Sequence, residues 1–208
     1  TTTIRMLLDI IRPTQGKATV FGLDSHKQSL EIRKDIGYLP GELALYDGMS
    51  GAEFLRYSSN LRGGSDHDFG FEIAERLSCD LARPIRDLSH GNKQKLGLIQ
   101  AFMHRPRLII LDEPSQGLDP LVQREFYTMV DEVKQEGCTV FLSSHVLPEA
   151  ERVCDRVGFI RDGKMVAVER IEDMKARALR YIEVKFEGQV PLDAISSIKG
   201  IKGLLADG

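Results

Sequence analysis

The chain has 208 residues, of which 42% are hydrophobic, and its 28 basic and 31 acidic residues give a formal net charge of −3. This composition excludes a disordered, collagen-like or disulfide-stapled chain and is typical of one folded domain with a small annex. Near-balanced charge argues against a protein that coats nucleic acid, and no apolar run reaches the roughly 20 residues that span a bilayer. Three widely separated cysteines (Cys79, Cys138 and Cys154) indicate reduced thiols in a cytosol.

The first part of the chain predicts one helix and two short strands. Ile4, Leu7, Leu8 and Ile11 fall on one helical face, and we expect Pro13 to end that helix. Residues 18–21 predict a strand closed by glycine 22, and residues 36–39 predict a second strand stopped by a Pro-Gly pair.

Residues 48–105 predict a helical insertion, because they contain no strand pattern. Ser50 and Glu53 have the spacing of a capping box at the start of a first helix. A Gly-Gly-Ser sequence at 63–65 separates it from a second helix, and Ser89 is expected to open a third.

The following segment predicts buried strands that alternate with a helix. Leu108–Leu111 is continuously apolar, which suits a strand buried on both faces of a parallel sheet, and residues 139–142 predict another such strand. Between them, Asp119-Pro120 predicts the start of a helix that Gly137 ends. Two short strands around 161–163 predict a hairpin. The alternation indicates an α/β fold with crossover connections.

After residue 169 the pattern changes, and the alternation over 181–186 predicts a strand in a small α+β accessory region. We therefore expect four parts, namely a core segment, the helical subdomain, a second core segment and the start of an accessory region: 1–47, 48–105, 106–168 and 169–208.

Asp112 and Glu113 follow directly after the predicted strand 108–111. Ligands of open α/β sheets bind at this end of the strands, where one carboxylate can hold the water shell of Mg²⁺. The other can orient and deprotonate a water aimed at a γ-phosphate. The alternative is that the two acids only keep the strand end soluble.

Three further polar groups fit the same chemistry. Ser89 to Asn92 would place a hydroxyl and free N–H groups at a helix N-terminus, which suits an anion. His145 follows the second buried strand, and Asp119 lies six residues after Glu113. Each also has a simpler interpretation, since serine and aspartate cap helices and a histidine can merely end a strand.

In this order and spacing, the residues resemble the nucleotide-binding domain of ABC ATPases over roughly residues 1–168. Residues 88–92 look like the signature motif, 108–113 like Walker B and 115–119 like the D-loop, while His145 looks like the switch histidine. The sequences of residues 91–95 and of the turn 40–42 resemble those of the exporter branch of the family, whose members serve drug, antibiotic or lipid permeases.

The resemblance implies a P-loop NTPase fold of ABC type with ATP and Mg²⁺ as its cofactors. It implies that Asp112 holds Mg²⁺ through water, that Glu113 is the general base and that His145 contacts the γ-phosphate. It further implies that the signature residues grip ATP held by a second subunit, with Asp119 coupling the two sites; the gripping residues would be Ser89, His90, Gly91 and Asn92.

One motif of the family is absent, because no G-x-x-x-x-G-K sequence followed by Ser or Thr occurs. Residues 1–5 resemble the family's residues directly after that lysine, so we expect the chain to begin at this point of the motif. Thr1 would then ligate Mg²⁺ through its hydroxyl, and Thr2 would contact the nucleotide; alternatively, these threonines only cap a helix. The chain alone is expected to bind ATP weakly, to hydrolyse it negligibly and to expose a sheet edge.

The sequence departs from the family pattern at three positions. His90 replaces a glycine of the signature motif, Gly41 replaces the Q-loop glutamine, and Gln116 replaces a serine. Glu42 or a water could supply the polar group missing at Gly41. Residues 41–46 and the helical subdomain are expected to dock on a permease.

We therefore expect the energy-supplying subunit of a membrane exporter. It would dimerise around ATP, act without direct contact to nucleic acid and lie in the cytoplasm, peripherally on the inner face of the membrane. The alternatives are an ABC ATPase that acts on nucleic acid or ribosomes, and a degenerate domain that serves only as an interaction module.

Overall fold

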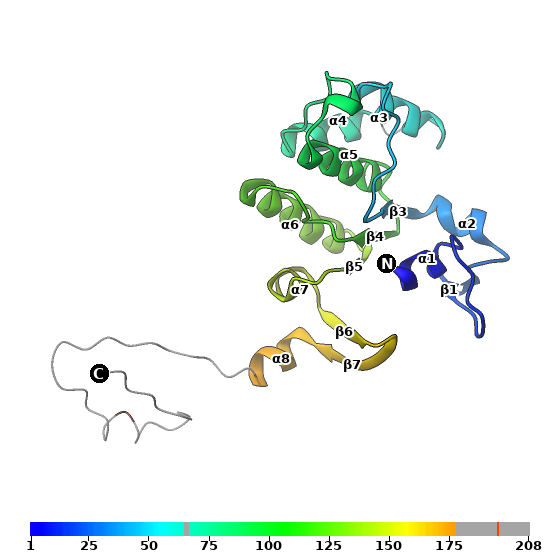
Figure 1. The fold of residues 1–208 in the computed structure, drawn as a ribbon, viewed down its shortest axis with the longest axis vertical. Helices are drawn as coiled ribbons and strands as arrows, with labels where there is room; N and C mark the ends of the chain where they lie inside the picture. Colours follow the sequence, from blue (N-terminus) through cyan, green and yellow to red (C-terminus); the bar gives the residue numbers. More distant parts are fainter. Residues whose placement is uncertain (65–66, 178–194, 196–208) are drawn as a thin grey trace. The chain divides into compact units, whose positions relative to one another are not determined.

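A computed structural model describes residues 1–64, 67–177 and 195. Residues Thr1–Ile171 form one compact unit, which is described here by itself (Figure 1). Its first half contains, in order, α1 Thr2–Leu7, β1 Thr19–Val20, β2 Leu23–Asp24, α2 Ser29–Lys34, β3 Ile36–Leu39, α3 Gly51–Asn60, α4 His67–Arg76 and the 3₁₀ turn η1 Ile85–Asp87. The second half contains α5 His90–Phe102, β4 Leu108–Asp112, α6 Pro120–Gln135, β5 Thr139–Ser143, α7 Leu147–Val153, β6 Arg156–Arg161 and β7 Lys164–Arg170, and α8 spans Ile171–Arg177.

The central sheet has the strand order β3-β4-β5 and is parallel throughout, which confirms the predicted α/β arrangement. The register pairs Ile36 with Leu108, and Leu108 with Thr139. Parallel neighbours need crossover connections, and the helical insertion and α6 supply them.

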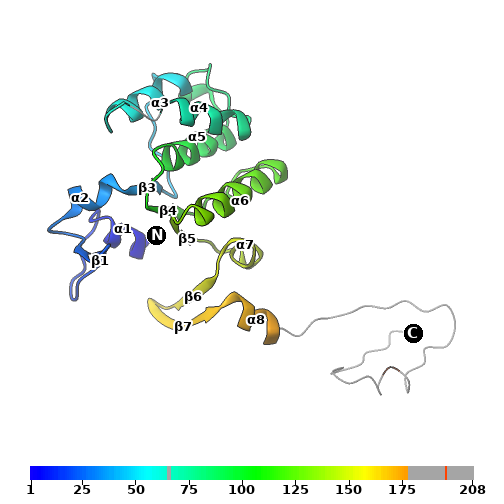
Figure 2. The same cartoon turned by 180° about the vertical axis from the view of Figure 1, so that it is seen from behind.

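β4 is buried on both faces because its alternate side chains enter two different cores. Ile109 and Leu111 pack in the larger core with side chains of α3 to α6, whereas Leu108 and Ile110 pack in a smaller core with α1 and α2. Helices therefore cover both faces of the sheet, as the two opposite views show (Figures 1 and 2). The uninterrupted apolar run of this strand follows from that double burial.

The helical subdomain begins with the predicted capping box. The Glu53 N–H donates to the Ser50 hydroxyl over 3.3 Å, and the Ser50 N–H donates to the Glu53 carboxylate over 2.8 Å. Arg76 on α4 then bridges to α6, with its guanidinium 2.7 Å from both a Glu125 and a Glu132 carboxylate oxygen. This ion-paired bridge ties the helical subdomain to a helix of the core.

Two antiparallel hairpins flank the parallel sheet. The β6–β7 hairpin turns at Asp162 and Gly163, both with positive φ, and confirms the predicted hairpin. The β1–β2 hairpin turns in the same way at Phe21 and Gly22, with φ of 56° and 79°. Only the first strand of that hairpin is predicted from the sequence, because a phenylalanine in the left-handed region is uncommon.

The first helix is shorter than its apolar spacing predicts. It ends at Leu7 rather than near Pro13, because Asp9 adopts a φ of 53° and the N–H groups of Ile10 and Ile11 both bond to the Arg5 carbonyl. Ile11 is 38% exposed and so does not contribute to the buried face.

The prediction that residues 139–142 are buried on both faces is also wrong. β5 is half-exposed along its length, and Phe141 keeps 41% of its surface accessible. Within the described residues β5 pairs only with β4, so it forms an edge of the sheet.

None of the described helices combines the length and apolarity that crossing a bilayer requires. The strand predicted for residues 181–186 lies outside the described residues.

Candidate active site at the carboxyl ends of the parallel strands

Asp112 ends β4 and is 1% exposed. The Ser143 hydroxyl at the end of β5 donates to its Oδ1 atom, and the amino nitrogen of Thr1 lies 3.5 Å from the same oxygen. Burial alone would raise the pKa of Asp112, but hydrogen bonding from the Ser143 and Thr1 side chains lowers it. Asp112 is therefore an ionised, buried acid at the start of α1.

Thr1 precedes α1 as its N-cap residue, and Thr2 is the first helical residue. The Thr1 side chain makes no capping hydrogen bond and instead interacts with Asp112. In both views the amino terminus lies beside the ends of β4 and β5 (Figures 1 and 2). The structure thus brings together the two residues predicted to bind Mg²⁺, and Thr1 occupies the N-cap position of α1 without a capping hydrogen bond from its side chain.

Glu113 and His145 form a pair across the same strand ends. The Nδ1 atom of His145 lies 2.8 Å from Oε2 of Glu113, and the Glu113 side chain is 28% exposed. The hydrogen bond with Glu113 and its negative charge, aided by the charge of Glu149, raise the pKa of His145 above 6.5. The Glu113 carboxylate therefore stabilises the protonated form of the His145 imidazole relative to the neutral form.

The backbone at Glu113 is unusual, with a φ of 54° in the left-handed region. Its N–H donates to the Ser143 carbonyl over 3.0 Å and continues the pairing of β4 with β5. The chain then turns sharply into the loop 113–119, which leads to α6. This turn places the Glu113 side chain at the edge of the sheet beside His145 rather than along the strand.

The signature-like segment forms the N-terminal tip of α5. Ser89 is its N-cap, and the Ser89 hydroxyl accepts from the Asn92 N–H over 3.2 Å. The Asn92 amide oxygen accepts from the Asp80 N–H over 3.4 Å, so this side chain is used within the chain. Ser89 and His90 are exposed and remain accessible to a ligand or a second molecule.

The tip of α5 packs directly on the loop 113–119. A β-carbon on Gly91 would lie 2.7 Å from the Gly117 carbonyl oxygen, and one on Gly117 would lie 2.5 Å from the His90 ring. Gly117 also has a φ of 74°. Glycine is thus required at both positions, by close approach and, at Gly117, by conformation.

Asp119 serves as the N-cap of α6. Its Oδ1 atom accepts from the N–H groups of Leu121 and Val122 over 3.0 and 3.1 Å. Asp119 therefore caps α6 in the structure. Capping does not conflict with a role at a subunit interface.

Two glutamines that the sequence patterns did not indicate hold the loop 113–119. The Gln94 amide donates to the carbonyls of Glu113 and Pro114 over 3.3 and 3.2 Å. The Gln123 amide donates to those of Ser115 and Leu118 over 3.4 and 3.1 Å. The available signal was a polar residue on a buried helical face, since Gln94 lies four residues before the buried Leu98.

The residues around Asp112 fit a hard divalent cation. Its Oδ2 atom is buried without a hydrogen-bond partner among the described residues, and a β-carbon on Gly41 would lie 3.2 Å from that atom. The Thr1 side chain supplies a second oxygen nearby. The described residues contain no group of three or more His, Cys, Asp or Glu suited to a metal ion. Mg²⁺ fits such a site because it takes few protein ligands and completes its shell with waters and phosphates.

Comparisons with known proteins match this architecture. The ABC transporter family profile matches residues 1–116. The bacitracin transport ATP-binding protein BcrA of Bacillus licheniformis is 34% identical over 192 residues, covering 91% of this chain and 63% of that protein. The ABC transporter ATP-binding protein NatA of Bacillus subtilis is 33% identical over 192 residues, covering 88% and 78%. A probable multidrug ABC transporter ATP-binding protein of Escherichia coli, YbhF, is 34% identical, covering 85% of this chain and 31% of that protein.

Solved structures of ABC ATP-binding proteins have the same fold as this chain. An ATP-binding subunit of an ABC transporter superposes with a TM-score of 0.75 at 28% identity, covering 85% of this chain and 75% of that one. The dimeric post-hydrolysis state of an ATP-binding cassette bound to ADP and Pi superposes with a TM-score of 0.73 at 17% identity, which supports the fold. The family profile, the relatives and the parallel sheet with acids at its strand ends all indicate the same family. The chain therefore belongs to the ABC transporter family as an ATP-binding domain.

Proposed function

We propose that this domain binds and hydrolyses ATP to power a membrane exporter, and that it works as an ATP-dependent dimer at the cytoplasmic face of the membrane. The observation that carries the proposal is the Glu113–His145 pair, 2.8 Å apart, beside the buried Asp112. The relatives named for bacitracin and multidrug transport support transport rather than action on nucleic acid.

In this proposal, Asp112 and Thr1 hold Mg²⁺, with Asp112 acting through bound water. The metal, when bound, neutralises charge on the phosphates of ATP. The ionised state of Asp112 suits this task, because its low pKa keeps the carboxylate charged near neutral pH. Its free Oδ2 atom is the acceptor available to such a ligand shell.

Glu113 is the proposed general base. It accepts a proton from a water as the water oxygen bonds to the γ-phosphorus and the bond from that phosphorus to the bridging oxygen breaks. His145 orients the carboxylate by its hydrogen bond and, when protonated, presents a positive charge that attracts the γ-phosphate. The products are ADP and inorganic phosphate.

The tip of α5 is the proposed contact to the ATP of a second copy or a related subunit. Ser89 and His90 are exposed there, next to Gly91 and Asn92 at the start of a 13-residue helix. N–H groups at such a tip favour a phosphate. Asp119, on the loop that packs against this tip, would lie between the two sites and couple them. Two subunits related head to tail would then enclose two ATP molecules.

Hydrolysis by the complete gene product tests the chemistry. Glu113→Gln keeps the side-chain shape and removes the base, so turnover is expected to fall by about 100-fold or more, with little change in ATP affinity. Glu136→Gln, at the exposed C-cap of α6, is the matched control and keeps wild-type turnover. Near wild-type turnover in Glu113→Gln would reject Glu113 as the base.

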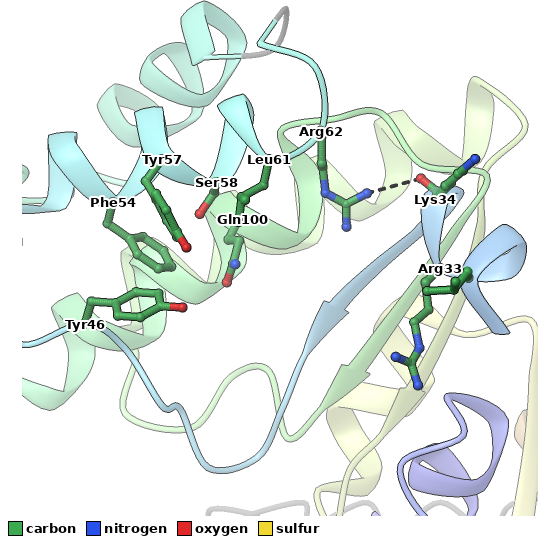
Figure 3. A pocket seen from close by; sticks show the side chains of 10 residues that line it. Arg33, Lys34, Tyr46, Phe54, Tyr57, Ser58, Leu61, Arg62 and Gln100 are labelled. Atoms are coloured by element: carbon green, nitrogen blue, oxygen red, sulfur yellow. Dashed lines mark hydrogen bonds between the residues drawn. The ribbon is translucent and has the colours of Figure 1, made fainter.

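A permease is the proposed partner, and its docking site is an open groove of about 790 Å³ (Figure 3). Aromatic and aliphatic side chains line one end and cationic side chains the other. The groove is lined by Leu30, Arg33, Lys34, Tyr46, Phe54, Tyr57, Ser58, Leu61, Arg62 and Gln100.

The groove fits a short helix from a cytoplasmic loop of the permease, with an apolar face and an acidic end. Leu30, Tyr46 and Leu61 are 78%, 52% and 70% exposed, which leaves apolar surface to cover. Lys34 supplies charge that would complement acidic residues, whereas the Arg33 guanidinium already donates to the Leu8 carbonyl.

The loop between β3 and α3 links this groove to the proposed nucleotide site. It passes Gly41, beside Asp112, and reaches Tyr46, whose ring centroid lies 5.4 Å from that of Tyr57. We propose that nucleotide state reaches the permease along this loop. Leu61→Glu is expected to reduce co-purification with the permease, whereas Val166→Glu, on an exposed β7 position, is not. Equal co-purification of both variants would place the docking site elsewhere.

A further inference from the structure

The main chain of Glu113 is held in a conformation that glutamate disfavours. Its φ of 54° lies in the left-handed region, where a β-carbon crowds the backbone. Such a conformation persists only when surrounding contacts determine it. Two backbone hydrogen bonds act on this residue: its N–H donates to the Ser143 carbonyl over 3.0 Å, and its carbonyl accepts from the Gln116 N–H of the same loop over 3.3 Å.

Gln94 adds a restraint that comes from outside the strand and the loop. Its Nε2 atom donates to the Glu113 carbonyl over 3.3 Å and to the Pro114 carbonyl over 3.2 Å. The residue is 3% exposed, so water cannot easily replace these bonds. The amide thus bridges two successive carbonyls at the point where β4 turns into the loop.

Gln94 also belongs to the helix whose tip carries the signature residues. It lies five residues after Ser89, in the second turn of α5. Above it, Gly91 packs against the Gly117 carbonyl and the His90 ring packs against Gly117 itself. The tip of α5 and the loop 113–119 are therefore joined at both ends of their contact.

We propose that Gln94 is a positioning residue: it fixes the main chain of Glu113 and makes the tip of α5 and the loop 113–119 one rigid unit. This inference rests on the proposed function, in which the tip grips the partner's ATP and Glu113 acts on the chain's own ATP. Through Gln94, engagement of the tip is transmitted to the position of the base. Gln94 acts through Glu113 and does not touch the reacting atoms.

The first test measures the geometry without ATP. Gln94→Met keeps the unbranched length and removes both donors. Amide hydrogen exchange should then accelerate about tenfold at Glu113, Gln116 and Leu118, whose N–H groups bond within or beside the loop. Ile99→Val, a fully buried position further along α5, is the control for general destabilisation. Equal exchange in the loop for Gln94→Met and Ile99→Val would overturn the inference.

The second test measures turnover of the complete gene product. Gln94→Met is expected to lower kcat by up to about 100-fold through a displaced base, with the KM for ATP unchanged and with a lower Hill coefficient. Wild-type kcat in Gln94→Met, beside an inactive Glu113→Gln, would overturn this inference and leave the proposed function standing. An active Glu113→Gln would instead reject the proposed function. A raised KM with unchanged kcat would show that Gln94 serves binding and would also overturn the inference.

Discussion

Gly91→Ala tests the close packing between the tip of α5 and the loop 113–119. The new β-carbon would lie 2.7 Å from the Gly117 carbonyl oxygen, which is a main-chain atom in a loop held by two glutamine amides. Replacing a helical glycine by alanine stabilises a helix by up to about 1 kcal/mol. Overpacking against an atom that cannot move aside costs about 1–3 kcal/mol. We therefore expect a net loss of about 1–2 kcal/mol.

Urea unfolding followed by circular dichroism measures this loss. With a slope of about 2 kcal/mol per molar urea, the midpoint should fall by about 0.5–1 M. Gly70→Ala on α4 is the matched control, because its β-carbon would meet the flexible end of Met103 at 3.2 Å. That variant should be as stable as the wild type or slightly more stable. If Gly91→Ala matched Gly70→Ala in stability, the tip and the loop would not be in the contact described.

Three further results are expected. The pKa of the His145 imidazole, measured by NMR, should lie above 6.5 and return toward 6.5 in Glu113→Gln. The Glu113–His145 pair contributes its full stabilisation below pH 6.5 and loses it as the pH rises through the raised pKa. A wild-type pKa at or below 6.5 would contradict this pair. Arg76→Ala should cost about 1 kcal/mol or less, because the bridge to Glu132 is partly exposed, and high salt should shrink the difference; a salt-independent loss would mean that packing dominates. Burial raises the pKa of the Cys79 thiol to about 11, so alkylation at pH 8 should be slow until urea unfolds the chain, and fast labelling of the native chain would contradict that burial.

The elements that could be predicted are those whose patterns are set locally. β4 can be predicted because burial on both faces requires an uninterrupted apolar run. The Ser50–Glu53 capping box can be predicted because it depends only on two residues three apart. The turn at Asp162-Gly163 likewise depends on two residues that tolerate positive φ. The candidate site residues came instead from the resemblance of motifs spread over residues 88–145 to a known family, and their roles stay a prediction.

The elements that could not be predicted depend on partners distant in the sequence. α2 has a single buried residue, Ile32, so its sequence carries almost no periodic signal. The apolar run of β5 does not reveal that Phe141 lies at a sheet edge. The role of Gln94 arises only when α5 meets the loop 113–119, and no spacing rule connects a glutamine to carbonyls about 20 residues away.

The central claim is that each active site combines Glu113 of one subunit with the Ser89 tip of the other. Mixing two inactive variants of the complete gene product, Glu113→Gln and Ser89→Arg, measures this most directly. Mixed dimers would contain one site with both residues intact, so ATP hydrolysis should rise well above that of either variant alone. A mixture that stays as inactive as its two components would contradict a site shared between subunits.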